Sequence, residues 1–461
     1  MATDALRDDI SRIEDAEVTS PAVEDTRDLD VKMQWGQVVE IDSSYRRASK
    51  FTRFYRSVLF QMILFGALSF VGPAMSDAIS NLGGGGLSTP FLANLATSLN
   101  AASGFFVALC GGPLINKLGI RWACVLAGVA MPLAGSGYYV SARWGVDWYL
   151  LVSRVVGGVF DGFLYVAETT AMLSYPDQND RGLFLECTGV IWAFMLSPTS
   201  KVRHRDGSKA ATSTDISWGA EFKALWKHLQ NRKTWLMFFP AFYSFFYGGT
   251  LGTYLGLHFS VRARALSSLI TPTVTIPMVV AYGRLMDQQR WSQMHRAWIG
   301  VLIWLIPQVG CFIWIGIEYS KFGTEKAALD YVLNTRQWAE AYLPYLLIFT
   351  TGYLTQLSLY WILGTFSTDV KSSARTGGLF RAFETLGQAV SYAINSNAAA
   401  DPRVALYVNC GLLVAVVPCL VVLVGMVPER PVGFDVDVDE RPLLGRGSLG
   451  GEGVEGGRKD V

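Results

Sequence analysis

Residues 148–176 read WYLLVSRVVGGVFDGFLYVAETTAMLSYP, a stretch of 29 residues with only three charged side chains. About 20 apolar residues, each rising 1.5 Å along an α-helix, are enough to cross the hydrocarbon core of a bilayer. The length and composition of this stretch therefore predict a transmembrane helix, and the rest of the chain is interpreted outward from it.

Similar apolar blocks recur along the chain. The chain has 461 residues, of which 51% are hydrophobic and 17% charged, and its mean hydropathy is +0.29, values that are not typical of a soluble globular protein. We expect an all-α polytopic membrane protein with about ten or eleven spans. The candidate spans are 57–76, 90–113, 119–141, 146–174, 183–197, 235–257, 265–285, 297–318, 343–366, 377–396 and 404–427.

Polar segments divide these blocks into five parts. We predict a disordered cytosolic tail over 1–50, a helical bundle over 51–198, a cytosolic linker over 199–233, a second bundle over 234–428 and a disordered cytosolic tail over 429–461. Basic residues precede the first span and fill the linker, and Lys and Arg favour the cytosolic side of a membrane. The basic residues of the linker are Lys201, Arg203, Arg205, Lys209, Lys223, Lys227, Arg232 and Lys233.

The number of spans before the linker conflicts with this charge pattern. Four spans from a cytosolic N-terminus return the chain to the cytosol near 175–181, and a fifth would place the basic linker outside. The apolar run 183–197 is also short for a span. About one span is therefore missing from the N-terminal half, or this run does not cross.

The stretch 148–176 carries its charges at a regular spacing. Arg154, Asp161 and Glu168 follow one another at intervals of seven residues, which places them near one stripe of a helix. An ionised carboxylate inside an apolar span is costly, so Asp161 and Glu168 should face the bundle interior. Two interpretations remain open: a substrate or proton pathway, and an ion pair that fixes packing.

A second polar group lies in the span over 377–396. Arg381 precedes Glu384 by three residues, and Gln388 follows Glu384 by four, so all three can meet on one helix face. A pathway role and a self-paired structural role both fit this spacing.

The turn after the second candidate span reads GGPLINKLGIRW, residues 111–122. This segment resembles the loop between helices two and three of major facilitator transporters, and an echo of it, AYGRLMDQQR, occupies the corresponding place in the second half. The resemblance implies close helix approach at the glycines and a cytosolic latch formed by the charged residues. The matching residues are Gly112, Asn116, Lys117, Gly119 and Arg121, followed in the second half by Gly283, Asp287 and Arg290.

Several segments, taken in order, resemble fungal Unc-93-like membrane proteins, a branch of the major facilitator superfamily. They include FGALSFVGPAMSDAISNLGGGGLST in 65–89, MLSYPDQNDRG in 172–182, FSVRARAL in 259–266 and ARTGGLFRAFETLGQ in 374–388. The resemblance implies the major facilitator fold of two helical bundles. It also implies a whole further span after Leu185, where this chain continues at once with Glu186, in agreement with the charge argument.

The sequence has no nucleotide-binding motif, metal-ligand cluster or nucleophile elbow, so we expect no enzyme, no cofactor and no metal site. The basic residues form no nucleic-acid-binding domain. We expect a secondary transporter of a small molecule or ion that works by alternating access between two halves in the lipid bilayer. The alternative, which the animal members of the family suggest, is a non-transporting membrane regulator or trafficking chaperone.

The C-terminal tail contains an acidic dileucine pattern formed by Asp439, Leu443 and Leu444. Sorting adaptors bind such patterns in disordered cytosolic tails. We therefore expect a multi-pass protein of the plasma membrane or of a vacuolar or endosomal membrane, with an adaptor as a partner of the tail.

Overall fold

The computed structural model describes most of the helical part of the chain. The described residues are 29–34, 37–42, 48–69, 89–174, 217–288, 290–322, 328–366, 370–397, 399 and 401–429. The predicted short span 183–197, most of the linker and the dileucine pattern lie outside the described residues. The predictions made for those segments, the missing span included, stay predictions.

Helices dominate the first half, as its apolar blocks predict. A Pro at the first position and a Thr89 side chain that accepts a hydrogen bond from the Leu92 N–H start the helix over Pro90–Leu109. Its described helices are α3 (Lys50–Tyr55), α4 (Val58–Ser69), α7 (Pro90–Leu109), α8 (Gly111–Leu118), α9 (Ile120–Trp144) and α10 (Asp147–Ser174).

The second half begins with a helix of the linker and continues with long apolar helices. Ser217, Asn231, Ser260 and Ser292 cap four of them by accepting a hydrogen bond from a backbone N–H of the first turn. The helices are α11 (Trp218–Leu229), α12 (Arg232–Ser244), α13 (Tyr247–His258), α14 (Val261–Met286), α15 (Gln293–Lys321), α16 (Thr335–Gly364), α17 (Val370–Ile394) and α18 (Arg403–Gly425).

Seven helices of the described chain are long and apolar enough to cross a membrane: α7, α9, α10, α14, α15, α16 and α18. This confirms a polytopic helical membrane protein. Three other predicted spans correspond to helices outside this set. α4 is described only as far as Ser69, the helix over 232–258 is divided in two, and α17 carries Lys371, Arg375, Arg381 and Glu384.

Three segments differ from the sequence-based expectation. The predicted span 235–257 is broken between α12 and α13 at Phe245 and Phe246. Residues 114–118, which we expected to form a turn after the span 90–113, are helical and belong to α8, and the chain then turns at Gly119, whose positive φ of 76° suits glycine. Inside the predicted disordered tail, β1 (Leu29–Gln34) and β2 (Gln37–Asp42) pair as an antiparallel hairpin.

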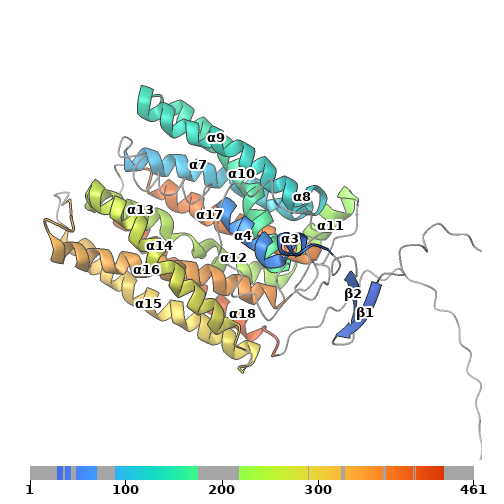
Figure 1. The fold of residues 1–461 in the computed structure, drawn as a ribbon. Helices are drawn as coiled ribbons and strands as arrows, with labels where there is room; N and C mark the ends of the chain where they lie inside the picture. Colours follow the sequence, from blue (N-terminus) through green and yellow to red (C-terminus); the bar gives the residue numbers. More distant parts are fainter. Residues whose placement is uncertain are drawn as a thin grey trace, which may run out of the picture.

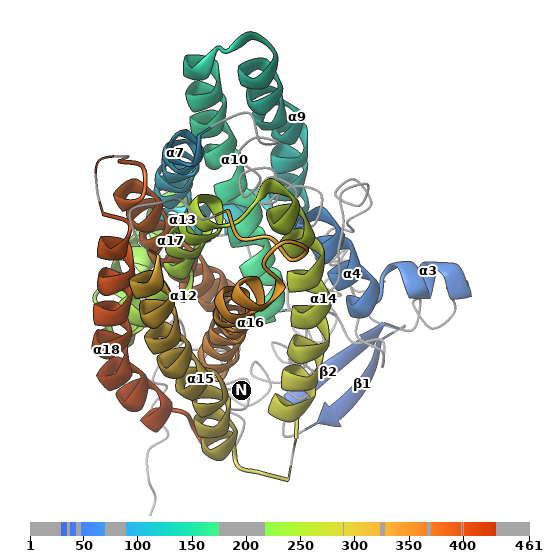
Figure 2. The ribbon, with the colours of Figure 1, turned by 90° about the vertical axis from the view of Figure 1, so that its left-hand side faces the viewer.

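The buried apolar residues form two main clusters that follow the two halves of the chain. One draws on residues between 58 and 171 together with Ala382, and the other on residues between 225 and 427. In Figures 1 and 2, α7, α9 and α10 lie on one side of the helical array, α14, α15 and α16 lie on the other, and α17 and α12 lie between them. α17 packs against α7, α8 and α10 of the first half and against α12 of the second, so it carries its polar residues into the interface.

Candidate functional site between the two halves

Arg381 of α17 joins the two halves through its guanidinium group. It donates from Nη2 to the Glu168 carboxylate of α10 at 3.1 Å and from Nη1 to the Glu384 carboxylate at 2.7 Å. Its Nε donates to the Thr169 hydroxyl of α10 at 2.8 Å. The Arg381 side chain is 10% exposed and the Glu384 side chain 1%, so this is a buried network. A guanidinium group supplies several donors in one plane, which suits two carboxylates and a hydroxyl at once.

Two tyrosines complete the environment of this guanidinium group. The Cζ atom of Arg381 lies 5.1 Å from the ring centroid of Tyr165 on α10 and 5.5 Å from that of Tyr360 on α16. The face of an aromatic ring attracts a cation within about 6 Å. The charge of Arg381 is thus held by partners from both halves.

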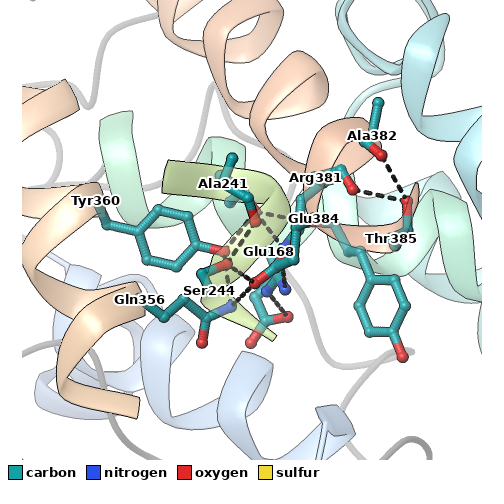
Figure 3. Close-up of polar contacts among 11 residues, drawn as sticks. Glu168, Ala241, Ser244, Gln356, Tyr360, Arg381, Ala382, Glu384 and Thr385 are labelled. Atoms are coloured by element: carbon teal, nitrogen blue, oxygen red, sulfur yellow. Dashed lines mark hydrogen bonds and ion pairs between the residues drawn. The ribbon is translucent and has the colours of Figure 1, made fainter. Parts of the chain in front are cut away.

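Glu384 is fixed by side chains of two further helices, α12 and α16. Its Oε1 accepts hydrogen bonds from the Ser244 hydroxyl of α12 at 3.2 Å and from the Gln356 amide of α16 at 2.8 Å (Figure 3). The same Gln356 amide nitrogen donates to the Tyr360 hydroxyl at 3.2 Å. Four helices, α10, α12, α16 and α17, therefore converge on one group of polar side chains, which we call the Arg381 cluster: Glu168, Thr169, Ser244, Gln356, Tyr360, Arg381 and Glu384.

The break between α12 and α13 lies directly beside this cluster. A broken helix leaves backbone carbonyls without their usual partners, and inside a bilayer they need others. The Phe246 carbonyl at the break accepts a hydrogen bond from the Ser391 hydroxyl of α17. Gly249 allows this approach, because a Cβ there would lie 2.5 Å from the Ser391 Oγ. Discontinuous helices of this kind form the substrate sites of many secondary transporters.

The three residues of the predicted stripe on α10 lie in two different environments. Glu168 lies in the Arg381 cluster, whereas Asp161 and Arg154 face other helices of the first half. The Asn100 amide of α7 donates to the Asp161 carboxylate at 3.0 Å and to the Arg154 carbonyl at 3.2 Å. The Arg154 guanidinium lies over the Tyr138 ring of α9, 5.6 Å from its centroid. The three stripe residues are therefore not brought together in one site.

Gln388, predicted with Arg381 and Glu384, is half-buried and has no recorded polar contact in the described part of the chain. The members of the Arg381 cluster that the sequence analysis missed are Thr169, Ser244, Gln356 and Tyr360. Gln356 could have been noticed, since it is a polar side chain inside a long apolar block. Thr169, Ser244 and Tyr360 could not, because such residues are common in any span.

The loop motif of the first half packs against α17. A Cβ on Gly112 would lie only 2.7 Å from the Arg375 Cα, so α8 and α17 meet backbone to backbone. The Asn116 amide donates to the Glu221 carboxylate of α11 at 3.2 Å, and the Arg375 Nε donates to the same oxygen at 3.4 Å. Lys117 lies in the last turn of α8, and Arg121 lies in the first turn of α9. Glu221, which is 1% exposed, thus links both halves, although the sequence did not single it out.

The matching motif of the second half ends α14. Gly283 is buried, Asp287 is the C-cap residue, and the Asp287 N–H donates to the Gly283 carbonyl at 3.0 Å. Arg290 is exposed. The second motif thus lies at the C-terminal end of a long helix, whereas Gly112 and Asn116 of the first lie within the short helix α8.

The sequence is similar to several known proteins, and no family profile matches it. The protein named Notoamide biosynthesis cluster protein O', from Aspergillus versicolor, is 26% identical over 74% of this chain and 83% of its own length. UNC93-like protein 1 from Arabidopsis thaliana is 23% identical over 80% of this chain and 90% of its own. A multi-drug resistance efflux pump of Streptococcus pneumoniae is 30% identical over 29% of this chain and 33% of its own.

The resemblance to Unc-93-like proteins is thus confirmed over most of the chain by a relative that carries that name. Together with the seven apolar helices, these relatives show a multi-pass integral membrane protein.

Proposed function

We propose, on the premise of this similarity to UNC93-like membrane proteins, that the chain is a secondary transporter of the major facilitator type. It moves a small molecule or ion by alternating access between the half before the linker and the half after it. Transport, rather than catalysis, is the activity that the relatives support, since one of them is named as an efflux pump.

The observation that carries this proposal is the ion pair between Glu168 and Arg381 across the interface. Charged side chains within a membrane protein are costly and usually mark a pathway or a coupling site. A buried ion pair with a purely structural role stabilises the fold little more than well-packed apolar residues of similar volume would. A pair that joins two rocking halves has a further use, because it can form in one state and break in the other.

The names of the same relatives suggest which kind of molecule is transported. The Aspergillus relative is named as a protein of a biosynthesis cluster, and the streptococcal relative is named as a multi-drug resistance efflux pump. We propose a small organic molecule as cargo, with export as the direction. A plasma-membrane or vacuolar location, and an adaptor bound at Leu443 and Leu444, belong to this proposal.

The test is a transport assay that compares Glu168→Gln with the wild type. Cells that express each form are loaded with a panel of small fluorescent organic dyes, and retention of each dye is followed. We expect the wild type to lower retention of some dyes and Glu168→Gln to abolish the effect. Glu340→Gln is the matched control, because Glu340 is 41% exposed and pairs with Arg336 away from the cluster.

Two outcomes would contradict this proposal, the first for transport itself and the second for the role of the Arg381 cluster. The first is that cells in which the wild-type protein is present in the membrane retain every dye to the same extent as cells without it. That result would favour a membrane regulator or chaperone. Equal losses in Glu168→Gln and Glu340→Gln would remove the special role of the cluster.

A further inference from the structure

α11, the helix of the linker, presents three different faces. Its packed face carries Glu221 and Leu225, which are 1% and 6% exposed. Glu221 is held there by Asn116 and Arg375, and the His228 ring bonds the Thr376 hydroxyl of α17 at 2.9 Å. These contacts fix the rotation of α11 about its axis, and so they determine which side chains face outward.

The second face is an exposed aromatic stripe. Trp218, Phe222 and Trp226 follow at intervals of four residues, which places them along one side of the helix. They are 47%, 45% and 64% exposed, and the rings of Trp218 and Phe222 stack with centroids 6.4 Å apart. Water-exposed aromatic side chains at this density are unfavourable on a surface that stays in contact with water.

The third face is basic. Lys223 and Lys227 are exposed on α11, and Arg232 and Lys233 continue the positive charge into the start of α12. No acidic side chain is exposed on α11, whose one carboxylate is that of the buried Glu221. The outward surface of α11 is thus apolar and positively charged.

The junction with α12 places this surface beside the start of the predicted span 235–257. α11 ends at Leu229 and α12 starts at Arg232, so the two helices are joined by a tight connection. The Thr234 hydroxyl donates to the His228 carbonyl at 2.7 Å, and the Trp235 indole N–H donates to the Leu229 carbonyl at 2.9 Å. Trp235 itself is 57% exposed at the first turn of a predicted span, a place where tryptophans lie among lipid headgroups.

We infer that α11 binds anionic lipids of the cytoplasmic leaflet. Trp218, Phe222 and Trp226 lie among the headgroups, and Lys223 and Lys227 attract their negative charge. A helix with an aromatic face and lysines beside it has the chemistry of an interfacial helix. Anionic lipids are the occupant that the charge supports, because an apolar protein partner would not need the lysines.

Lipid binding is thereby linked to the contact between the halves. The same short helix holds Glu221 between Asn116 of the first half and Arg375 of the second. Lipids that hold α11 at the membrane surface favour the state in which this contact is made. An anionic leaflet therefore stabilises closure of the side on which the linker lies.

The test measures protection of α11 from water in nanodiscs that contain the whole chain with its native cysteines replaced. Phe222→Cys reports on the aromatic stripe, and Leu333→Cys, at an exposed position in the segment between α15 and α16 and away from α11, is the control. The rate of modification by a water-soluble maleimide is compared in phosphatidylcholine alone and in phosphatidylcholine with phosphatidylserine. We expect phosphatidylserine to slow the reaction at Phe222→Cys about 25-fold, since each of the two lysines near an anionic surface contributes a factor of about five. The rate at Leu333→Cys should stay unchanged.

Adding Lys223→Glu and Lys227→Glu should restore the fast reaction at Phe222→Cys. The inference is overturned by equal rates in both lipid mixtures, or by protection that survives these charge reversals. Protection that is found in native membranes but not in either nanodisc would identify a protein as the occupant, and would also overturn it. None of these readouts depends on transport.

Discussion

At the residue scale, the balance of charges around Arg381 determines how strongly a substitution there destabilises the interface between the halves. One guanidinium group contacts the carboxylates of Glu168 and Glu384, and both pairs are largely removed from water. Removing a partner from a buried ion pair leaves an uncompensated charge, whereas replacing all partners by neutral groups does not. The cost of a single substitution should therefore exceed the cost of a combined one.

We predict that Arg381→Met lowers the free energy of unfolding by about 3–5 kcal/mol, because two carboxylates lose their counter-ion. Adding Glu168→Gln and Glu384→Gln to Arg381→Met should recover most of this loss. The measurement is the midpoint of thermal unfolding in detergent micelles. A triple variant no more stable than Arg381→Met would show that the charges are not the reason.

Asp330, outside the spans, provides a second test at this scale. Its carboxylate accepts hydrogen bonds from the Arg262 guanidinium at 2.6 and 3.0 Å, from the Val332 N–H at 2.8 Å and from the Ser260 hydroxyl at 2.7 Å. The hydrogen bond from Arg262, followed by those from Val332 and Ser260, holds the pKa of Asp330 well below its ordinary value. These bonds attach the segment between α15 and α16 to the start of α14.

A lowered pKa means that this attachment stabilises the fold above the ordinary pKa of about 3.9 and is lost as the pH falls through the folded value. We predict that Asp330→Asn increases hydrogen exchange in residues 328–334 at neutral pH. The wild type should approach the variant only in strong acid. A difference that stays constant from neutral pH to the acid limit would contradict the assignment.

At the element scale, the contact between α8 and α17 depends on missing side chains. A Cβ on Gly112 would lie 2.7 Å from the Arg375 Cα, a backbone atom that cannot move alone. Gly378 on the facing helix has a similar constraint, since its Cβ would lie 2.9 Å from the Gly112 nitrogen. The glycines thus set the separation of two helices that belong to different halves.

We predict that Gly112→Ala lowers the free energy of unfolding by about 1–3 kcal/mol, because the two helices must separate. Gly135→Ala is the matched control, since a Cβ there meets nothing within 4 Å, and it should be neutral or slightly stabilising. Thermal unfolding of both variants in detergent is the measurement. Equal effects at the two positions would argue against close packing at Gly112.

At the scale of the whole molecule, the charges of the linker predict the orientation in the membrane. With the linker in the cytosol, the segment between α15 and α16 lies outside. Leu333 in that segment is 77% exposed, and Gln230 at the end of α11 is also exposed. The two positions should therefore lie on opposite sides of the membrane.

We predict that a membrane-impermeant thiol reagent labels Leu333→Cys in intact cells and fails to label Gln230→Cys, both in a chain with its native cysteines replaced. Permeabilisation should make both sites reactive. Labelling of Gln230→Cys in intact cells would reverse the orientation.

The length and apolar content of the blocks were enough to determine a polytopic helical protein, because the bilayer requires helices of a set length. The spacing of Arg381 and Glu384 also predicted their pairing, since helix geometry brings residues three apart together. Local sequence could determine these features because each depends on neighbours along one helix.

The tertiary structure alone decided which helices meet. The contact of Glu168 with Arg381 joins residues that are 213 apart, and the contacts of Glu384 with Ser244 and Gln356 come from two further helices. The buried position of Glu221 depends equally on α8 and α17. A charged side chain in an apolar span indicates that a polar partner is needed, but the packing of the helices determines which side chain is that partner.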